Sequence, residues 1–226
     1  MALENVMTAA ATDATTFVAQ LRAEVEAYCR TLDDRLPAYS YVPLTTDDQR
    51  LLVLQSRLHN EIRAAEVYGG WLRTIPELDV KALAADNAHE EMGHAALLVR
   101  QLEARGCDPF AYTPPPAQVV LFNALEGLTS TAERLAAFPL AGEVLASYLI
   151  RKALESPAVP DWIKEPYRRI GEEEEGHGEY PLALLARYAT NAEAQALVRR
   201  GVAIGIRLRE RYFAELDEMV FEGRRW

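Results

Sequence analysis

The chain contains 226 residues, 50% of them hydrophobic, which is enough for one well-packed domain, or for two only if both are small. Its formal net charge of −10 argues against non-specific nucleic-acid binding, because such binding depends on basic patches. Two cysteines without a Cys-x-x-Cys motif exclude a disulfide framework and a rubredoxin-type iron centre.

The sequence shows no targeting or membrane segment. Residues 1–11 have neither the basic start nor the long apolar core of a signal peptide. No stretch approaches the roughly 18 uninterrupted apolar residues of a membrane span. We therefore expect a cytoplasmic protein with no membrane span and no nucleic-acid partner.

The pattern of helix formers, prolines and caps predicts an all-α fold in a single domain, residues 1–226. A capping box at residues 46–49 predicts the start of one long helix, and Gly106 predicts the end of the next. In chain order, the expected helices cover residues 13–36, 46–74, 80–105, 117–155, 162–188 and 191–221.

Three prolines are expected to disturb these helices, because proline lacks the N–H that closes a helical turn. We expect a break near Pro139 in the helix 117–155 and interruptions at Pro166 and Pro181 in the helix 162–188. The four central helices would form a core bundle over residues 45–189. The helices 13–36 and 191–221 would flank that bundle and could cover a substrate cavity.

Two copies of Glu-x-x-His are the most informative motifs in the chain. They are Glu91-x-x-His94 and Glu174-x-x-His177, and each follows another glutamate, Glu90 or Glu173. Residues three apart lie on one face of a helix, so each copy can offer a carboxylate oxygen and an imidazole nitrogen to one point.

Two further carboxylates sit where they could complete a metal site. Glu61 lies seven residues, two helical turns, before Tyr68 and therefore on the same face. Glu66 is the rival, but it lies about 140° around the helix from Glu61, so both cannot point inward equally. Glu143 stands among apolar residues, where an unpaired charge is costly.

The intervals between these residues match. Glu61 precedes Glu91 by 30 residues, and Glu143 precedes Glu174 by 31. A helix, a turn and an antiparallel return would therefore bring each lone glutamate level with one Glu-x-x-His motif. The chain behaves as two helix-pair repeats that a pseudo-twofold axis through the site could relate.

These residues together resemble the ligand pattern of the ferritin-like di-iron carboxylate superfamily, over roughly residues 45–188. The resemblance implies a ferritin-like four-helix bundle with an extra helix at each end. It places Glu61 and His94 at one metal ion. It places Glu143 and His177 at a second, with Glu91 and Glu174 bridging the two. These six residues would form the metal and catalytic set.

The cofactor implied is a pair of iron ions. Four carboxylates would neutralise two Fe(II) ions, and carboxylate and imidazole ligands suit iron or manganese better than zinc or copper. Manganese or a mixed manganese–iron pair would also fit. Glu90 and Glu173 occupy the position from which an acid can orient a ligand histidine.

The resemblance favours the oxygenase and oxidase branch, similar to aldehyde-deformylating oxygenases and small di-iron hydroxylases or N-oxygenases. Such a protein would use O₂ to oxidise a small, partly apolar substrate, by hydroxylation, N-oxygenation, C–C cleavage or desaturation. Electrons would come from an external reductase or ferredoxin, and we expect a monomer or homodimer. The alternatives are a ferritin-like ferroxidase or iron-handling protein, a rubrerythrin-like peroxidase, and a purely structural helical protein.

Three local expectations complete the sequence picture. Gly176, Gly178 and Pro181 weaken the helix around His177, so we expect a kink or irregularity there. His59 lies on another face from Glu61 and is expected to face solvent. The acidic residues Glu126 and Glu133 are expected at the surface or in a channel.

Overall fold

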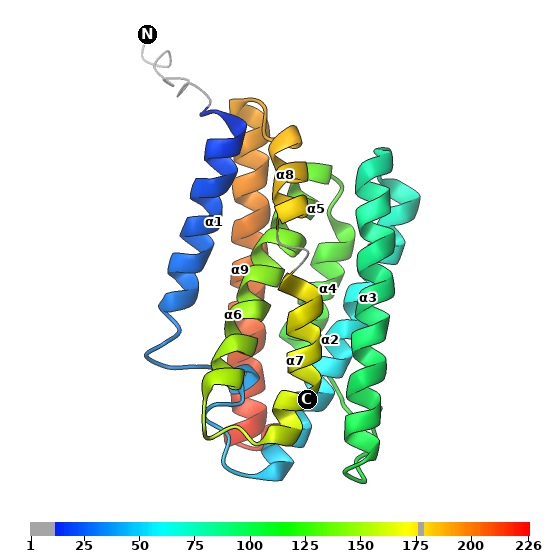
Figure 1. Ribbon diagram of the computed structural model, residues 1–226, viewed down its shortest axis with the longest axis vertical. Helices are drawn as coiled ribbons and strands as arrows, with labels where there is room; N and C mark the ends of the chain where they lie inside the picture. The colour runs from blue at the N-terminus through cyan, green and yellow to red at the C-terminus, as the bar shows by residue number, and fades with distance from the viewer. Residues whose placement is uncertain (1–11, 176–178) are drawn as a thin grey trace.

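The computed structural model describes residues 12–175 and 179–226, without the side chains of 172–179, and these residues form helices and no strand (Figure 1). The helices are α1 (Ala14–Arg30), α2 (Asp47–Thr74), α3 (Leu78–Glu103), α4 (Pro116–Gly127), α5 (Thr131–Leu135), α6 (Ala141–Glu155), α7 (Asp161–Glu175), α8 (Glu179–Tyr188) and α9 (Ala192–Phe221). A 3₁₀ turn, η1 (Ala38–Ser40), and a π-helical segment, η2 (Ala136–Leu140), complete them. The all-α prediction is confirmed. None of the described helices is long and apolar enough to cross a membrane.

The hairpin of α2 and α3 forms as the local signals predict. The hydroxyl of Thr46 accepts a hydrogen bond from the backbone N–H of Gln49, and the side-chain oxygen of Gln49 accepts one from the backbone N–H of Thr46. Beyond α3, Gly106 adopts a left-handed φ of 68°, and the next residue, Cys107, donates to the carbonyl of Leu102. This arrangement satisfies the last carbonyls of the helix.

The first helix is shorter than expected. It ends at Arg30, and residues 31–35 continue as turns in which Leu32 donates to Cys29 and Arg35 to Leu32. The residue before a proline avoids helical backbone, so the chain must leave the helix before Pro37. The buried face of α1 consists of Phe17, Val18, Leu21, Val25 and Cys29.

The expected helix 117–155 is broken twice. The break near Pro139 is confirmed, and it takes the form of the π-helical segment η2. A second break, at residues 128–130, separates α4 from α5 and was not expected. Gly127 ends α4, and glycine is a weak helix former. The segment therefore supplies a separate helix, α4, in addition to the helix that carries Glu143.

The terminal helix α9 packs more deeply than a flanking helix would. It contacts α4, α5 and η2, while α1 lies against α6 and α8 (Figure 1). A Cβ atom added to Gly205 would lie 2.5 Å from the carbonyl oxygen of Ala137. Only glycine allows the two backbones to approach this closely.

Pro166 does not interrupt its helix. It lies inside α7, which runs without a break from Asp161 to Glu175. Proline cannot donate to the carbonyl four residues earlier, that of Trp162, and Gln101 of α3 donates to that carbonyl instead. The expected irregularity at His177 falls on residues 176–178, which lie outside the described residues.

Candidate metal centre

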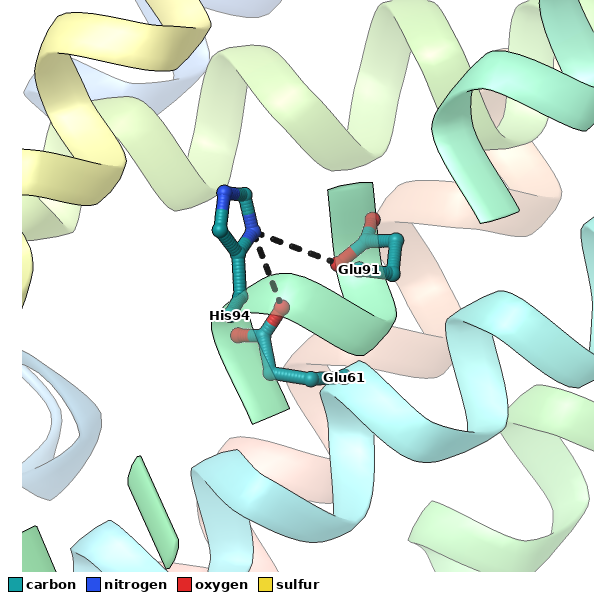
Figure 2. Close-up of side chains that lie close together, drawn as sticks. All are labelled: Glu61, Glu91 and His94. Atoms are coloured by element: carbon teal, nitrogen blue, oxygen red, sulfur yellow. Dashed lines mark ion pairs between the residues drawn. The ribbon is translucent and has the colours of Figure 1, made fainter. Parts of the chain in front are cut away.

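The hairpin brings Glu61 of α2 next to Glu91 and His94 of α3 (Figure 2). His94 Nδ1 lies 3.6 Å from Glu61 Oε2 and 3.7 Å from Glu91 Oε2. One ligand atom from each residue lies within 4.8 Å of the other two. The side chains of Glu61 and His94 are only 4% and 5% exposed, so the three donors converge inside the protein.

Glu61 and Glu66 take opposite positions, as the helical period requires. Glu61 is buried against α3, whereas Glu66 is exposed and pairs with Arg63. Tyr68 is buried two turns beyond Glu61 and stacks on Phe138, with ring centroids 4.7 Å apart. The structure therefore brings Glu61, and not Glu66, to the other two candidate ligands.

Glu143 reaches the same region from α6. It lines a small cavity of about 60 Å³ together with Glu61 and Glu91. Burial raises the pKa of Tyr68 well above its usual value, and the charges of Glu143 and Glu91 raise it further. Glu143 therefore lies in the same region as the three converging residues, on a different helix from the hairpin.

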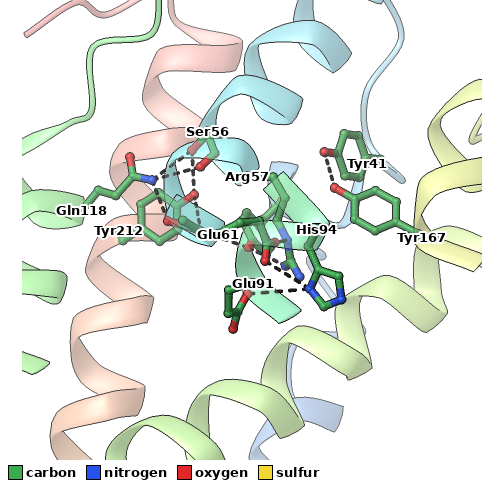
Figure 3. Close-up of polar contacts among 11 residues, drawn as sticks. Tyr41, Ser56, Arg57, Glu61, Glu91, His94, Gln118, Tyr167 and Tyr212 are labelled. Carbon is green, nitrogen blue, oxygen red and sulfur yellow. Dashed lines mark hydrogen bonds and ion pairs between the residues drawn. The ribbon is translucent and has the colours of Figure 1, made fainter. Parts of the chain in front are cut away.

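Arg57 holds Glu61 in a buried ion pair (Figure 3). Its Nε donates to Glu61 Oε1, and its Nη1 donates to the hydroxyl of Tyr39 at 2.5 Å. Burial alone would raise the pKa of Glu61, but the Arg57 charge, together with hydrogen bonding to Glu91 and His94, holds it below its usual value. Glu61 therefore stays ionised, with Oε2 facing His94.

A second buried arginine, Arg209 of α9, lies near Glu143. Its Nη1 donates to the carbonyl of Ala137 in η2 and to that of Gly205, both at 3.1 Å. Burial lowers the pKa of Arg209, and the charge of Glu143 opposes that shift. Together, Arg57 and Arg209 offset two negative charges of the described carboxylates. The charge balance expected from the sequence set four carboxylates against two Fe(II) ions and did not count these two arginines, so it is incomplete.

The second motif falls largely outside the described residues. The backbone of Glu174 belongs to α7, but its side chain, like that of Glu173, is not among the described ones, and His177 lies in the undescribed segment. Of the six predicted ligands, the structure brings Glu61, Glu91 and His94 together and adds Glu143 on a shared cavity wall. Glu90 is half-buried and lines a second, larger cavity.

This large cavity has a volume of about 670 Å³ and lies between α1, α3, α6 and α8. Glu91 and Glu143 line both cavities, and His94 lines the large one. The described ligand candidates therefore stand at the boundary between a narrow space facing α9 and a space wide enough for an organic molecule.

The donors suit a divalent metal ion. A buried carboxylate, a partly buried carboxylate and a buried imidazole within 4.8 Å provide hard oxygen ligands and a borderline nitrogen ligand, the combination that iron and manganese accept. Buried carboxylates that face one another are costly without a cation between them. Glu61 is partly compensated by Arg57, and its second oxygen remains directed toward His94.

Sequence reasoning missed both arginines and misplaced two other residues. Arg57 precedes Glu61 by four residues, a spacing that could have indicated the pair. His59 was expected in solvent, but it is half-buried and packs on Phe122. Glu126 is exposed, whereas Glu133 is buried and pairs with Arg200, because α9 covers α5.

No protein-family model matches the chain, and no curated protein matches it. A crystal structure from Shewanella denitrificans OS217, of a domain of unknown function with a heme oxygenase-like fold, is similar to the chain with a TM-score of 0.71. The two share 15% sequence identity, over 88% of this chain and 91% of that one. At this identity the likeness concerns the fold alone, so the chain shares its helical bundle architecture with a heme oxygenase-like domain.

Proposed function

We propose that the protein is a non-haem di-iron oxidase or oxygenase that uses O₂ to oxidise a small, partly apolar organic substrate. The observation that carries this proposal is the convergence of Glu61, Glu91 and His94, with Glu143 lining the same small cavity as the two glutamates. Bound iron would supply the redox chemistry with O₂. The large cavity, about 670 Å³, supports the assignment because it brings space for a substrate to Glu91, His94 and Glu143.

The chain's own residues would hold the metal and shape its surroundings. Glu61 would ligate through Oε2, because Arg57 occupies Oε1. His94 and Glu91 would ligate from the next helix, and Glu143 from α6. Glu174 and His177 would complete the set by the resemblance to di-iron proteins. The burial of Glu61 and His94 keeps bulk water away from these two side chains. An external reductase or ferredoxin would supply electrons.

Metal loading tests the proposal directly. Protein loaded anaerobically with Fe(II) and then desalted should retain two irons per chain, and fewer than one would refute the assignment. Glu91→Gln and Glu143→Gln should each lower the retained iron. Glu66→Gln is the matched control, because Glu66 is an exposed glutamate on the same helix as Glu61.

Oxygen consumption and particle size separate the enzyme from its alternatives. An oxygenase or oxidase should take up O₂ after loading with Fe(II) and remain a small particle in solution, as a monomer or homodimer. Assembly into a large iron-filled shell would instead indicate storage, and rapid turnover of hydrogen peroxide without O₂ uptake would indicate a peroxidase.

A further inference from the structure

The large cavity joins the candidate ligands to a basic end on α6. Glu143, Ser147 and Arg151 all line it, and they lie at successive four-residue steps on one helix face. The eight residues from Glu143 to Arg151 correspond to about 12 Å along the helix axis. The cavity therefore has a carboxylate end beside His94 and a guanidinium end two turns away.

The end of α1 adds a second arginine at the same place. Asp33, just beyond α1, accepts a hydrogen bond from Tyr148 and pairs with Lys152 at 2.7 Å. These contacts fix the end of α1 beside the last turns of α6 (Figure 1). Arg30, the last residue of α1, therefore lines the cavity near Arg151.

The thiol of Cys29 supports this placement. Cys29 lines the cavity, and its burial and the charge of Glu26 raise its pKa to about 11. The charges of Arg151 and Arg30 both oppose this rise. Cys29 therefore lines the same cavity as the two arginines and senses both of their charges.

These two arginines are available for a ligand. Among the residues that the structure describes, neither Arg30 nor Arg151 forms an ion pair, whereas Arg22 on the same wall pairs with Glu26 at 2.9 Å. The guanidinium of Arg151 lies 5.3 Å from the centre of the Tyr148 ring. In a chain with a net charge of −10, this is a local site of positive charge.

We propose that the large cavity binds an elongated substrate whose carboxylate end is held by Arg30 and Arg151 and whose apolar body reaches Glu91 and Glu143. Guanidinium groups match carboxylates in charge and geometry. The lining of the cavity includes apolar side chains that an aliphatic chain can contact, among them Val144, Ile150 and Leu182. The reaction at the far end rests on the proposed function, but the binding of the anion does not.

Calorimetric titration of metal-free protein with octanoate and with 1-octanol tests the carboxylate contact. Octanoate should bind about tenfold more tightly than 1-octanol, because only octanoate can pair with the arginines. The double variant Arg30→Gln/Arg151→Gln should lose about tenfold in affinity for octanoate and change less than about twofold for the alcohol. Arg207→Gln removes an exposed arginine outside the cavity and controls for net charge; it should change neither affinity.

Equal affinity for the two compounds, no binding of octanoate, or an unchanged affinity in the double variant would overturn the proposal. A further variant tests how far the apolar body reaches. Val144→Phe adds bulk beside Glu143 and should weaken octanoate binding by about tenfold; an unchanged affinity would show that the ligand does not extend to the carboxylates. Since every titration uses metal-free protein, failure of iron loading would refute the proposed function while leaving these results intact.

Discussion

The two cavities meet at Glu91 and Glu143, yet they are built in opposite ways. Around the small cavity, charged and polar side chains bond to one another: Arg57 donates to Glu61 and Tyr39, and Asn60 donates to Tyr39 at 3.0 Å. At the far end of the large cavity, the two arginines form no ion pair within the described residues. One side is arranged to fix the side chains of the candidate ligands, and the other leaves charges accessible to a bound molecule.

The hydrogen-bond network on the side of the small cavity extends well beyond the candidate ligands. Ser56 and Tyr212 hydrogen-bond at 2.7 Å (Figure 3). Gln118 donates to Asn60 at 2.7 Å. These residues come from α2, α4 and α9, so the network ties three helices to the turn of α2 that carries Glu61. Substitutions here should affect stability, whereas substitutions at the arginine end should affect binding.

The largest effect is expected at Arg57. Arg57→Met should lower the free energy of unfolding of metal-free protein at pH 7 by about 3–5 kcal/mol, because it leaves Glu61 buried without its main counter-charge. Urea unfolding measures this change. Arg63→Met is the control: its partner Glu66 is exposed, and such pairs contribute about 0–1 kcal/mol. Similar losses in the two variants would contradict the contrast between buried and exposed pairs.

Acid should reduce the effect of Arg57→Met. In the wild type, the pKa of Glu61 lies below its ordinary value of 4.5, so the ion pair stabilises the fold above that value and is lost as the pH falls toward the folded pKa. Without Arg57, burial would raise the pKa of Glu61, and protonation would relieve the cost of the buried charge. The difference in unfolding free energy between the wild type and Arg57→Met should therefore shrink from pH 7 to pH 4. A constant difference would show that the loss does not come from the charge of Glu61.

An intermediate effect is expected at Gly142, which lines the small cavity. A Cβ atom there would lie 2.3 Å from Arg209 Nη2 and 3.0 Å from Phe138 Cδ2. Arg209 cannot move aside freely, because it donates to two backbone carbonyls. Gly142→Ala should cost about 1–3 kcal/mol in thermal or urea unfolding. Gly93→Ala, whose Cβ would meet no atom within 4 Å, should instead be neutral or stabilising.

Ser56 should show a smaller effect. Its hydroxyl hydrogen-bonds with Tyr212 and accepts from Tyr112, so Ser56→Ala should cost about 1–2 kcal/mol. Because the network is shared, Ser56→Ala and Tyr212→Phe should not be additive in a double-mutant cycle of unfolding free energies. Full additivity would show that the two hydroxyl groups act independently.

Which features could be predicted from the sequence depends on whether they rest on local or on tertiary contacts. The α2–α3 hairpin depends on local signals, the capping box and Gly106, and the spacing of Glu91 and His94 places both on one face. The burial of Arg57 was not predictable, because its partners Tyr39 and Tyr167 come from distant segments.

The depth at which the terminal helix α9 packs was not predicted, for a similar physical reason. The close approach of α9 to η2 depends on Gly205 meeting the carbonyl of Ala137, a tertiary contact that no helical period reveals. Pro139 indicated that the helix would be disturbed, but not that a π-helical segment would offer a carbonyl to Arg209. Local patterns therefore predicted the hairpin that carries three of the candidate ligands, but not the charged residues that surround them.

The smallest effect on stability is expected at the arginine end. Arg151→Met removes an exposed guanidinium whose described contact is with the Tyr148 ring, so the free energy of unfolding should change by no more than about 0.5 kcal/mol. The same exchange of arginine for methionine at position 57 is expected to cost several times more. If Arg151→Met destabilised the protein as much as Arg57→Met, Arg151 would belong to the packed structure, and the distinction between the two sides of the site would fail. Parallel urea unfolding curves of the two variants decide between these outcomes.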